Sequence, residues 1–240
     1  MTSTVTHLDG ADTQANELWS TLQSTSTRFS STLSPSVLSD LMRFEDQACG
    51  ADLLPVLAAI ARHMHPLLVY LQYLNRIVEL SLFPRQHHFR CDLDLLNLDG
   101  DGAAQLQVMH VAPIPSSGLL DPAAAYAAHS GSMALLLWTM ALRGSHSALL
   151  PEIAGPVRYR LAPGQSLRRM PMEPWCASTL HCLGDEPASV QELAKESGSD
   201  RACTRRLLNA VYLQGRLMIT RSLPLQRAAS HTQRSARRGE

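Results

Sequence analysis

The amino-acid sequence predicts an α+β protein, with a mixed N-terminal domain containing a β-hairpin and helices, followed by a smaller and mainly helical C-terminal domain. Two patterns support this fold class. Residues 86–112 alternate apolar and polar side chains around an Asp-Gly-Asp-Gly turn, whereas residues 121–143 and 175–213 carry apolar side chains at helical spacing. A chain of 240 residues is also long enough for two small domains with cores of their own.

Composition and turn residues divide the chain into five expected segments. Residues 1–35 are rich in Ser and Thr, hold few large apolar side chains and are predicted to be largely disordered. The α+β domain is expected over residues 36–162, and three prolines make residues 163–174 a linker. The C-terminal domain is expected over residues 175–223, and residues 224–240 form a basic, disordered tail.

The first elements of the N-terminal domain follow from capping and apolar spacing. Asp52 is expected to cap a helix that runs through His63. Apolar side chains at helical spacing then favour a second helix, although the run LLVYLQYL also suits a buried strand. The side chains that define this second helix are Leu67, Leu71, Leu74 and Val78.

The later elements of this domain are a hairpin, a long helix and a strand. Alternation in QHHFRCDLDLLNL and AAQLQVMHVA, separated by the Asp-Gly turn, predicts a β-hairpin over residues 86–112. Asp121-Pro122 is expected to open a helix that stops at Arg143-Gly144. The segment VRYRL, residues 157–161, is expected to form a short strand.

The C-terminal domain has a start or stop signal at every expected element. Trp175 begins the first helix, and Ser189 with Glu192 fits a capping box at the start of the second. Gly198 supplies a left-handed turn, after which Ser199 or Asp200 caps a third helix. That helix has a buried stripe, ends at Gly215 and leads through the residues LMIT into a β-hairpin. Its buried stripe is Cys203, Leu207, Leu208 and Val211.

This order of helix, turn, arginine-bearing helix and strand resembles the winged helix-turn-helix family of DNA-binding domains, over about 50 of the 240 residues. In that family the third helix enters the major groove and the wing reaches the DNA backbone. The resemblance therefore implies nucleic-acid contacts from the outward positions of the third helix and from two arginines that flank the wing. These residues are Arg201, Arg205, Arg206, Asn209, Arg216 and Arg221. Arginine can bind guanine or phosphate, and asparagine can bind adenine.

Charge is distributed unevenly although the net charge is zero. From Arg201 to the C-terminus the chain holds nine Arg and one acidic residue, whereas residues 1–200 hold twelve basic and twenty acidic residues. A basic end on an acidic body favours an anionic partner for that end.

The leading interpretation is a cytoplasmic, bacterial-type transcription regulator. Its winged helix would bind DNA, and its N-terminal domain would dimerise or sense a ligand, because paired half-sites add specific contacts. The alternative is a non-enzymatic signalling or scaffold protein whose winged helix binds a protein partner. A homodimer is compatible with both interpretations.

Catalysis, cofactors, metals and membranes are not expected. Lys195 is the only lysine, and the sequence has neither a phosphate-binding loop nor a nucleophile elbow. Five scattered cysteines without a CxxC pair suggest buried free thiols, and the spacing of the histidines does not define a metal site. Neither a signal peptide nor an apolar run long enough for a bilayer is apparent.

Overall fold

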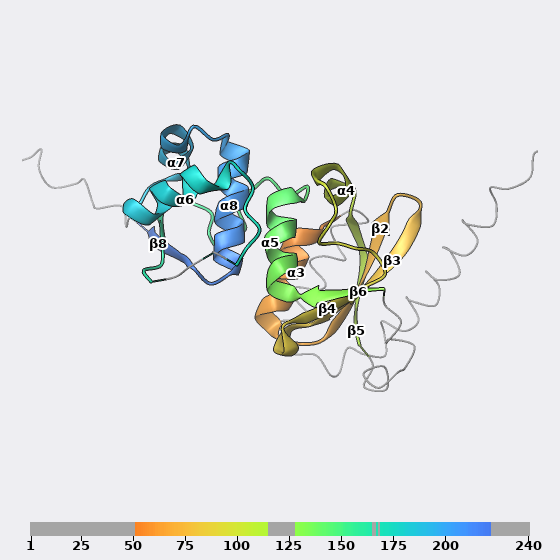
Figure 1. Ribbon diagram of the computed structural model, residues 1–240. Coiled ribbons are helices and arrows are strands. Elements are labelled where there is room, and N and C mark those ends of the chain that lie inside the picture. Colours follow the sequence, from red (N-terminus) through yellow and green to blue (C-terminus); the bar gives the residue numbers. More distant parts are fainter. Residues whose placement is uncertain (1–50, 115–127, 165–166, 168, 222–240) are drawn as a thin grey trace, which may run out of the picture. The chain divides into compact units, whose positions relative to one another are not determined.

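The computed structural model describes residues 51–114, 128–164, 167 and 169–221 (Figure 1). Helices and antiparallel strands are both present, so the predicted α+β class is confirmed. The chain divides into two compact units, and neither boundary lies at the predicted linker. The first unit comprises Met1–Leu95 and Gln105–Met133, and the second comprises Leu96–Ala104 and Ala134–Glu240. The predicted disordered segments, residues 1–35 and 224–240, lie outside the described residues.

The first unit contains a six-stranded antiparallel sheet in the order β1-β5-β2-β3-β4-β6. One face of the central strands is buried, because their alternate residues are apolar. Together with helix α3, that face supplies the core of the unit. The strands are β1 (Ala51–Asp52), β2 (Leu67–Tyr73), β3 (Arg76–Phe83), β4 (His88–Cys91), β5 (Gln107–Pro113) and β6 (His129–Ser132).

Helix α3 (Leu53–His63) has the bounds that the sequence predicted. Asp52 occupies the N-cap position, but its side chain makes no capping hydrogen bond. The helix ends at Met64, whose left-handed backbone (φ 57°) lets its N–H donate to the carbonyl of Ile60 at 3.3 Å. A short 3-10 turn, η1 (Pro84–Gln86), likewise ends in a left-handed residue, His87.

The predicted helix over residues 67–78 is wrong, since this segment is the hairpin β2–β3. Leu67 and Leu71 lie on the buried face of β2, and Val78 lies on the buried face of β3. Leu74 is at the turn, where it is exposed and has a positive φ of 55°. The error arose because the spacing from Leu67 to Leu71 satisfies both the helical period and the strand period.

The predicted hairpin over residues 86–112 is also wrong, although β4 and β5 both form. β4 pairs with β3 and β6, whereas β5 pairs with β1 and β2. The Asp-Gly segment is part of a short helix instead, α4 (Gly100–Ala104). The Asp99 side chain accepts a hydrogen bond from the Gly102 N–H at 2.7 Å, so it caps this helix.

The long helix expected from Asp121-Pro122 begins later than predicted. Residues 121–122 lie outside the described residues, and residues 129–132 are strand β6, paired with β4. Helix α5 (Met133–Arg143) then ends where the sequence predicted, before the buried Gly144. The N–H of Gly144 donates to the carbonyl of Met140 at 2.9 Å.

The second unit contains three consecutive helices and a two-stranded antiparallel sheet (Figure 1). Its strand β7 (Val157–Leu161) was predicted, but it was assigned to the N-terminal domain. β7 pairs along its full length with β8 (Leu217–Arg221), and Tyr159 also forms a bridge with Ala188. The strand that pairs with β8 in the described chain therefore precedes the three helices. These helices are α6 (Cys176–Asp185), α7 (Val190–Ser197) and α8 (Arg201–Leu213).

The predicted capping box at the start of α7 is confirmed. The Ser189 hydroxyl accepts the Glu192 N–H at 3.3 Å, and the Glu192 carboxylate accepts the Ser189 N–H at 2.7 Å. The Glu192 carboxylate also contacts Arg158 of β7 at 3.1 Å. The cap therefore fixes both the start of α7 and its connection to the sheet.

Replacing Ser189 by alanine is expected to lower the free energy of unfolding by about 1 kcal/mol, because the Glu192 N–H loses its acceptor. The backbone N–H of Ser189 holds the pKa of the Glu192 carboxyl below its usual range, with smaller effects from the Ser189 hydroxyl and Arg158. The stabilisation from the carboxylate is thus present above the usual carboxyl pKa and is lost as pH falls through the lowered value.

Urea unfolding of the wild type and of Ser189→Ala, at neutral pH and at about pH 3, measures both effects. Ser178→Ala is the control, because the exposed Ser178 hydroxyl makes only a 3.4 Å bond within α6. The control should change stability by less than about 0.5 kcal/mol. Equal stability of the two variants would contradict a role for the capping box.

Candidate functional site

Helix α8 is the candidate nucleic-acid-binding element, and both of its ends are fixed. Gly198 has a φ of 67°, which turns the chain between α7 and α8. The Asp200 carboxylate then caps α8 by accepting the Ala202 N–H at 2.9 Å. At the other end, the N–H of Gln214 donates to the carbonyl of Ala210 at 3.2 Å. The predicted start of this helix is therefore confirmed, with Asp200 as the cap.

Two of the predicted arginines lie on the N-terminal part of α8, which is the more accessible part of the helix. Arg201 is exposed, and Arg205 follows one turn later and is partly exposed. Residues four apart on a helix are neighbours on one face, so the two guanidinium groups extend from the same side. From Leu207 to Val211 every residue of α8 is buried, so the accessible part of the helix is its N-terminal part.

The interpretation of Asn209 as an outward residue is wrong. Asn209 is fully buried, and its side-chain amide bonds to the segment that follows α5. The Asn209 Oδ1 accepts the Leu150 N–H at 3.0 Å, and the Asn209 Nδ2 donates to the Ala148 carbonyl at 2.8 Å. Both functions of the amide are therefore used inside the protein, and Asn209 is not accessible to a base.

Arg206 is less accessible than the sequence predicted. The side chain is half-buried, and its Nε is buried without a hydrogen-bond partner among the described residues. The Arg206 guanidinium is therefore only partly available to a partner.

The arginines expected to flank the wing lie at the two ends of β8. Arg216 precedes the strand and is partly buried, and its carbonyl accepts the Ala162 N–H at 2.9 Å. Arg221 ends the strand and is exposed, with its Nη2 3.4 Å from the carbonyl of Glu152. Both residues lie in the same unit as α8.

The sequence reasoning missed two arginines of β7. Arg158 and Arg160 alternate with buried residues and are both exposed. Arg158 is held by the carbonyl of Pro187 at 2.8 Å in addition to its ion pair with Glu192. Arg160 pairs in register with the exposed Met218 of β8. The alternation of VRYRL was a usable signal, but assigning the strand to the other domain concealed its relevance.

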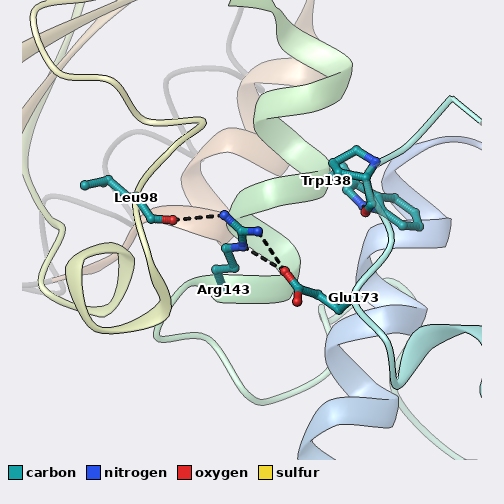
Figure 2. A network of polar contacts seen from close by, with 5 residues as sticks. Leu98, Trp138, Arg143 and Glu173 are labelled. Atoms are coloured by element: carbon teal, nitrogen blue, oxygen red, sulfur yellow. Dashed lines mark hydrogen bonds and ion pairs between the residues drawn. The ribbon is translucent and has the colours of Figure 1, made fainter.

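A second cluster in this unit was not predicted (Figure 2). The Arg143 Nε and Nη2 donate to the Glu173 Oε1 at 3.0 and 2.8 Å, and the Arg143 Nη1 donates to the Leu98 carbonyl at 3.1 Å. The Trp138 Nε1 donates to the Pro171 carbonyl at 2.8 Å. These bonds join residues 30 to 45 positions apart, for which the sequence contains no local signal.

This cluster borders a cavity of about 270 Å³, called here the α5 pocket because α5 supplies much of its lining. Most of the lining is apolar, and Arg143 and Glu173 are its charged residues. The apolar lining consists of Leu96, Leu135, Trp138, Leu142 and Pro171. The segment around residue 171, predicted to be part of a linker, thus forms one wall of a cavity.

The described cysteines are unpaired thiols. Cys91 and Cys176 are buried as predicted, and burial raises the pKa of each thiol to about 11. Both thiols are therefore protonated near neutral pH and are poor nucleophiles. Cys182 and Cys203 are partly exposed, which differs from the prediction, and Cys49 lies outside the described residues.

No group of three or more His, Cys, Asp or Glu side chains in the described ranges could hold a metal ion. No helix in the same ranges is long and apolar enough to cross a bilayer. Comparisons with protein-family models, curated proteins and solved structures give no match to this chain.

Proposed function

We propose that this protein is a regulator whose second unit binds DNA through helix α8, as a winged helix does. The observation that carries the proposal is the exposure of arginines on the N-terminal part of α8. The buried residues from Leu207 to Val211 anchor the helix in the unit, and Arg201 and Arg205 lie one turn apart before them. A capped helix with arginines near its N-terminal end is suited to a DNA groove.

The burial of Asn209 changes the expected mode of recognition. Without an accessible asparagine amide, α8 lacks the side chain expected to bind adenine. Arg201 and Arg205 remain available for phosphate or for guanine, and the exposed Arg160 of β7 offers a further cation. Binding should therefore depend strongly on salt, with phosphate contacts supplying much of the affinity.

A protein partner is the second candidate for the same surface. Met218 is 48% exposed on β8, directly opposite Arg160 in the two-stranded sheet. An exposed methionine is a common feature of protein-binding surfaces and contributes nothing to a phosphate contact. The first unit would dimerise or bind a ligand under either candidate.

The DNA proposal is tested by fluorescence anisotropy with a labelled random-sequence duplex. The double variant that carries both Arg201→Ala and Arg205→Ala should weaken DNA binding by roughly tenfold or more at low salt. It should also reduce the slope of log affinity against log salt by about 2, one for each lost phosphate contact. The full chain is used, so that the basic tail is present in every sample.

The matched control is Arg76→Ala/Arg85→Ala, which removes the same charge from exposed positions in the first unit. The control should keep near wild-type affinity. Absence of binding by the intact protein at low salt would refute the proposal. If both double variants lost DNA affinity equally, the binding would depend on net charge or on the tail. That result would also contradict the role of α8.

A further inference from the structure

The α5 pocket combines an apolar wall with one arginine, which is the pattern of a small-ligand site. Its volume of about 270 Å³ lies just below the usual range of ligand pockets, roughly 300–1,000 Å³. Leu96, Leu135 and Pro171 give the wall its accessible apolar surface, whereas Trp138, from the same helix as Leu135, is fully buried. An apolar molecule of modest size matches this lining.

Arg143 gives the site its chemical selectivity. A guanidinium group has five N–H donors in a planar fork, and three of those of Arg143 are engaged. Both bonds to Glu173 end on the same oxygen, Oε1. The stronger arrangement for this pair joins two parallel N–H groups to the two oxygens of one carboxylate. The Glu173 carboxylate therefore does not form the full two-oxygen pair with the Arg143 guanidinium.

The ion pair between Arg143 and Glu173 is also accessible to a competing carboxylate. The two side chains are 34% and 31% exposed, so water screens their attraction and can replace either partner. The Leu98 carbonyl continues to orient the guanidinium through Nη1 if Glu173 moves away. The Glu173 carboxylate thus occupies the position that a carboxylate brought by a ligand would take.

We propose that the α5 pocket binds a small apolar carboxylic acid, whose carboxylate replaces Glu173 on Arg143 while its apolar part packs against Leu96, Leu135 and Pro171. This inference concerns a different site from the α8 surface. It does not depend on DNA binding, and its test does not involve DNA.

The test uses benzoate, phenylacetate and hexanoate as probes, with benzamide, phenylacetamide and hexanamide as neutral counterparts. The readout is the Trp138 indole N–H signal in a ¹H–¹⁵N spectrum of the full chain, since this N–H donates to Pro171 beside the cavity. The chain has three tryptophans, so the signal is assigned by elimination with Trp19→Phe and Trp175→Phe. Trp138 itself stays unchanged.

At least one of the carboxylates should shift the Trp138 signal in a saturable manner, and its amide should bind roughly tenfold more weakly or not at all. Glu173→Gln should bind the carboxylate several-fold more tightly because the internal competitor is gone. Arg143→Gln should lose the response. Glu186→Gln, which alters an exposed carboxylate of the same unit, should behave as the wild type.

Tighter carboxylate binding by Glu173→Gln, together with loss of binding by Arg143→Gln, distinguishes a ligand site from a purely structural ion pair. In a structural pair, neither variant would alter the response to added carboxylates. The proposal is overturned if no carboxylate shifts the signal in either the wild type or Glu173→Gln. It is also overturned if acid and amide act alike, or if Glu173→Gln weakens binding.

Discussion

Asn209→Ala is expected to lower the free energy of unfolding by about 1–3 kcal/mol, because it leaves the buried Leu150 N–H without an acceptor, whereas the carbonyl of the exposed Ala148 can bond to water instead. The Leu150 N–H and the Ala148 carbonyl each bond to the Asn209 amide, at 3.0 and 2.8 Å. Each unsatisfied buried group costs roughly 1–3 kcal/mol, and alanine can replace neither bond. Urea unfolding monitored by circular dichroism measures the change.

Arg205→Ala is the control for this prediction, because it truncates to alanine a partly exposed side chain of the same helix. It should change stability by no more than about 0.5 kcal/mol. The effects on DNA affinity should be reversed. Arg205→Ala should weaken DNA binding, whereas the folded Asn209→Ala variant should retain it. If Asn209→Ala proved as stable as the control and bound DNA poorly, the buried role of Asn209 would be wrong.

Trp138→Ala is expected to destabilise the protein by about 3–5 kcal/mol, the range for removing a large aromatic side chain from a core. Trp138 is fully buried in α5, and its indole N–H donates to the Pro171 carbonyl. Alanine would remove both the packing and the bond that ties the 171–173 segment to α5. Thermal and urea unfolding of the variant measure the loss.

Trp138→Phe separates the two contributions. Phenylalanine retains most of the buried ring but has no N–H, so the loss should be clearly smaller than that of alanine. Leu135→Ala is a second comparison, because this α5 residue is only partly buried and should cost less than Trp138→Ala. A Trp138→Ala variant as stable as Leu135→Ala would show that Trp138 is not central to this core.

Local signals predicted the starts of α7 and α8 because both are marked by capping and turn residues. Ser189 with Glu192, Gly198 and Asp200 determine where α7 and α8 begin, through bonds that span at most three residues. Such signals are contained in a few neighbouring positions, so they can be read without the fold. Strand β7 was found for the same reason, from its alternation.

Long-range pairing explains the errors. Nothing near β4 or β5 indicates that each would pair with other strands, and the Asp-Gly residues suit a helix start as well as a turn. The inward side of α8 was inferred from its apolar stripe alone. Asn209 lies outside that stripe, and its partners Ala148 and Leu150 are about 60 residues away in the chain. The Arg143–Glu173 pair is unpredictable for the same reason.

The pairing of β7 with β8 also limits how the three helices can be inherited or transplanted. A fragment that starts at the predicted linker would lack β7, so one edge of β8 would lose its hydrogen bonds. The fragment would also lose the buried Tyr159, whose hydroxyl donates to the Ile153 carbonyl at 2.6 Å. The smallest transferable segment therefore begins before residue 153. Gene fusion or recombination that preserves this unit must keep that upstream stretch together with α6, α7 and α8.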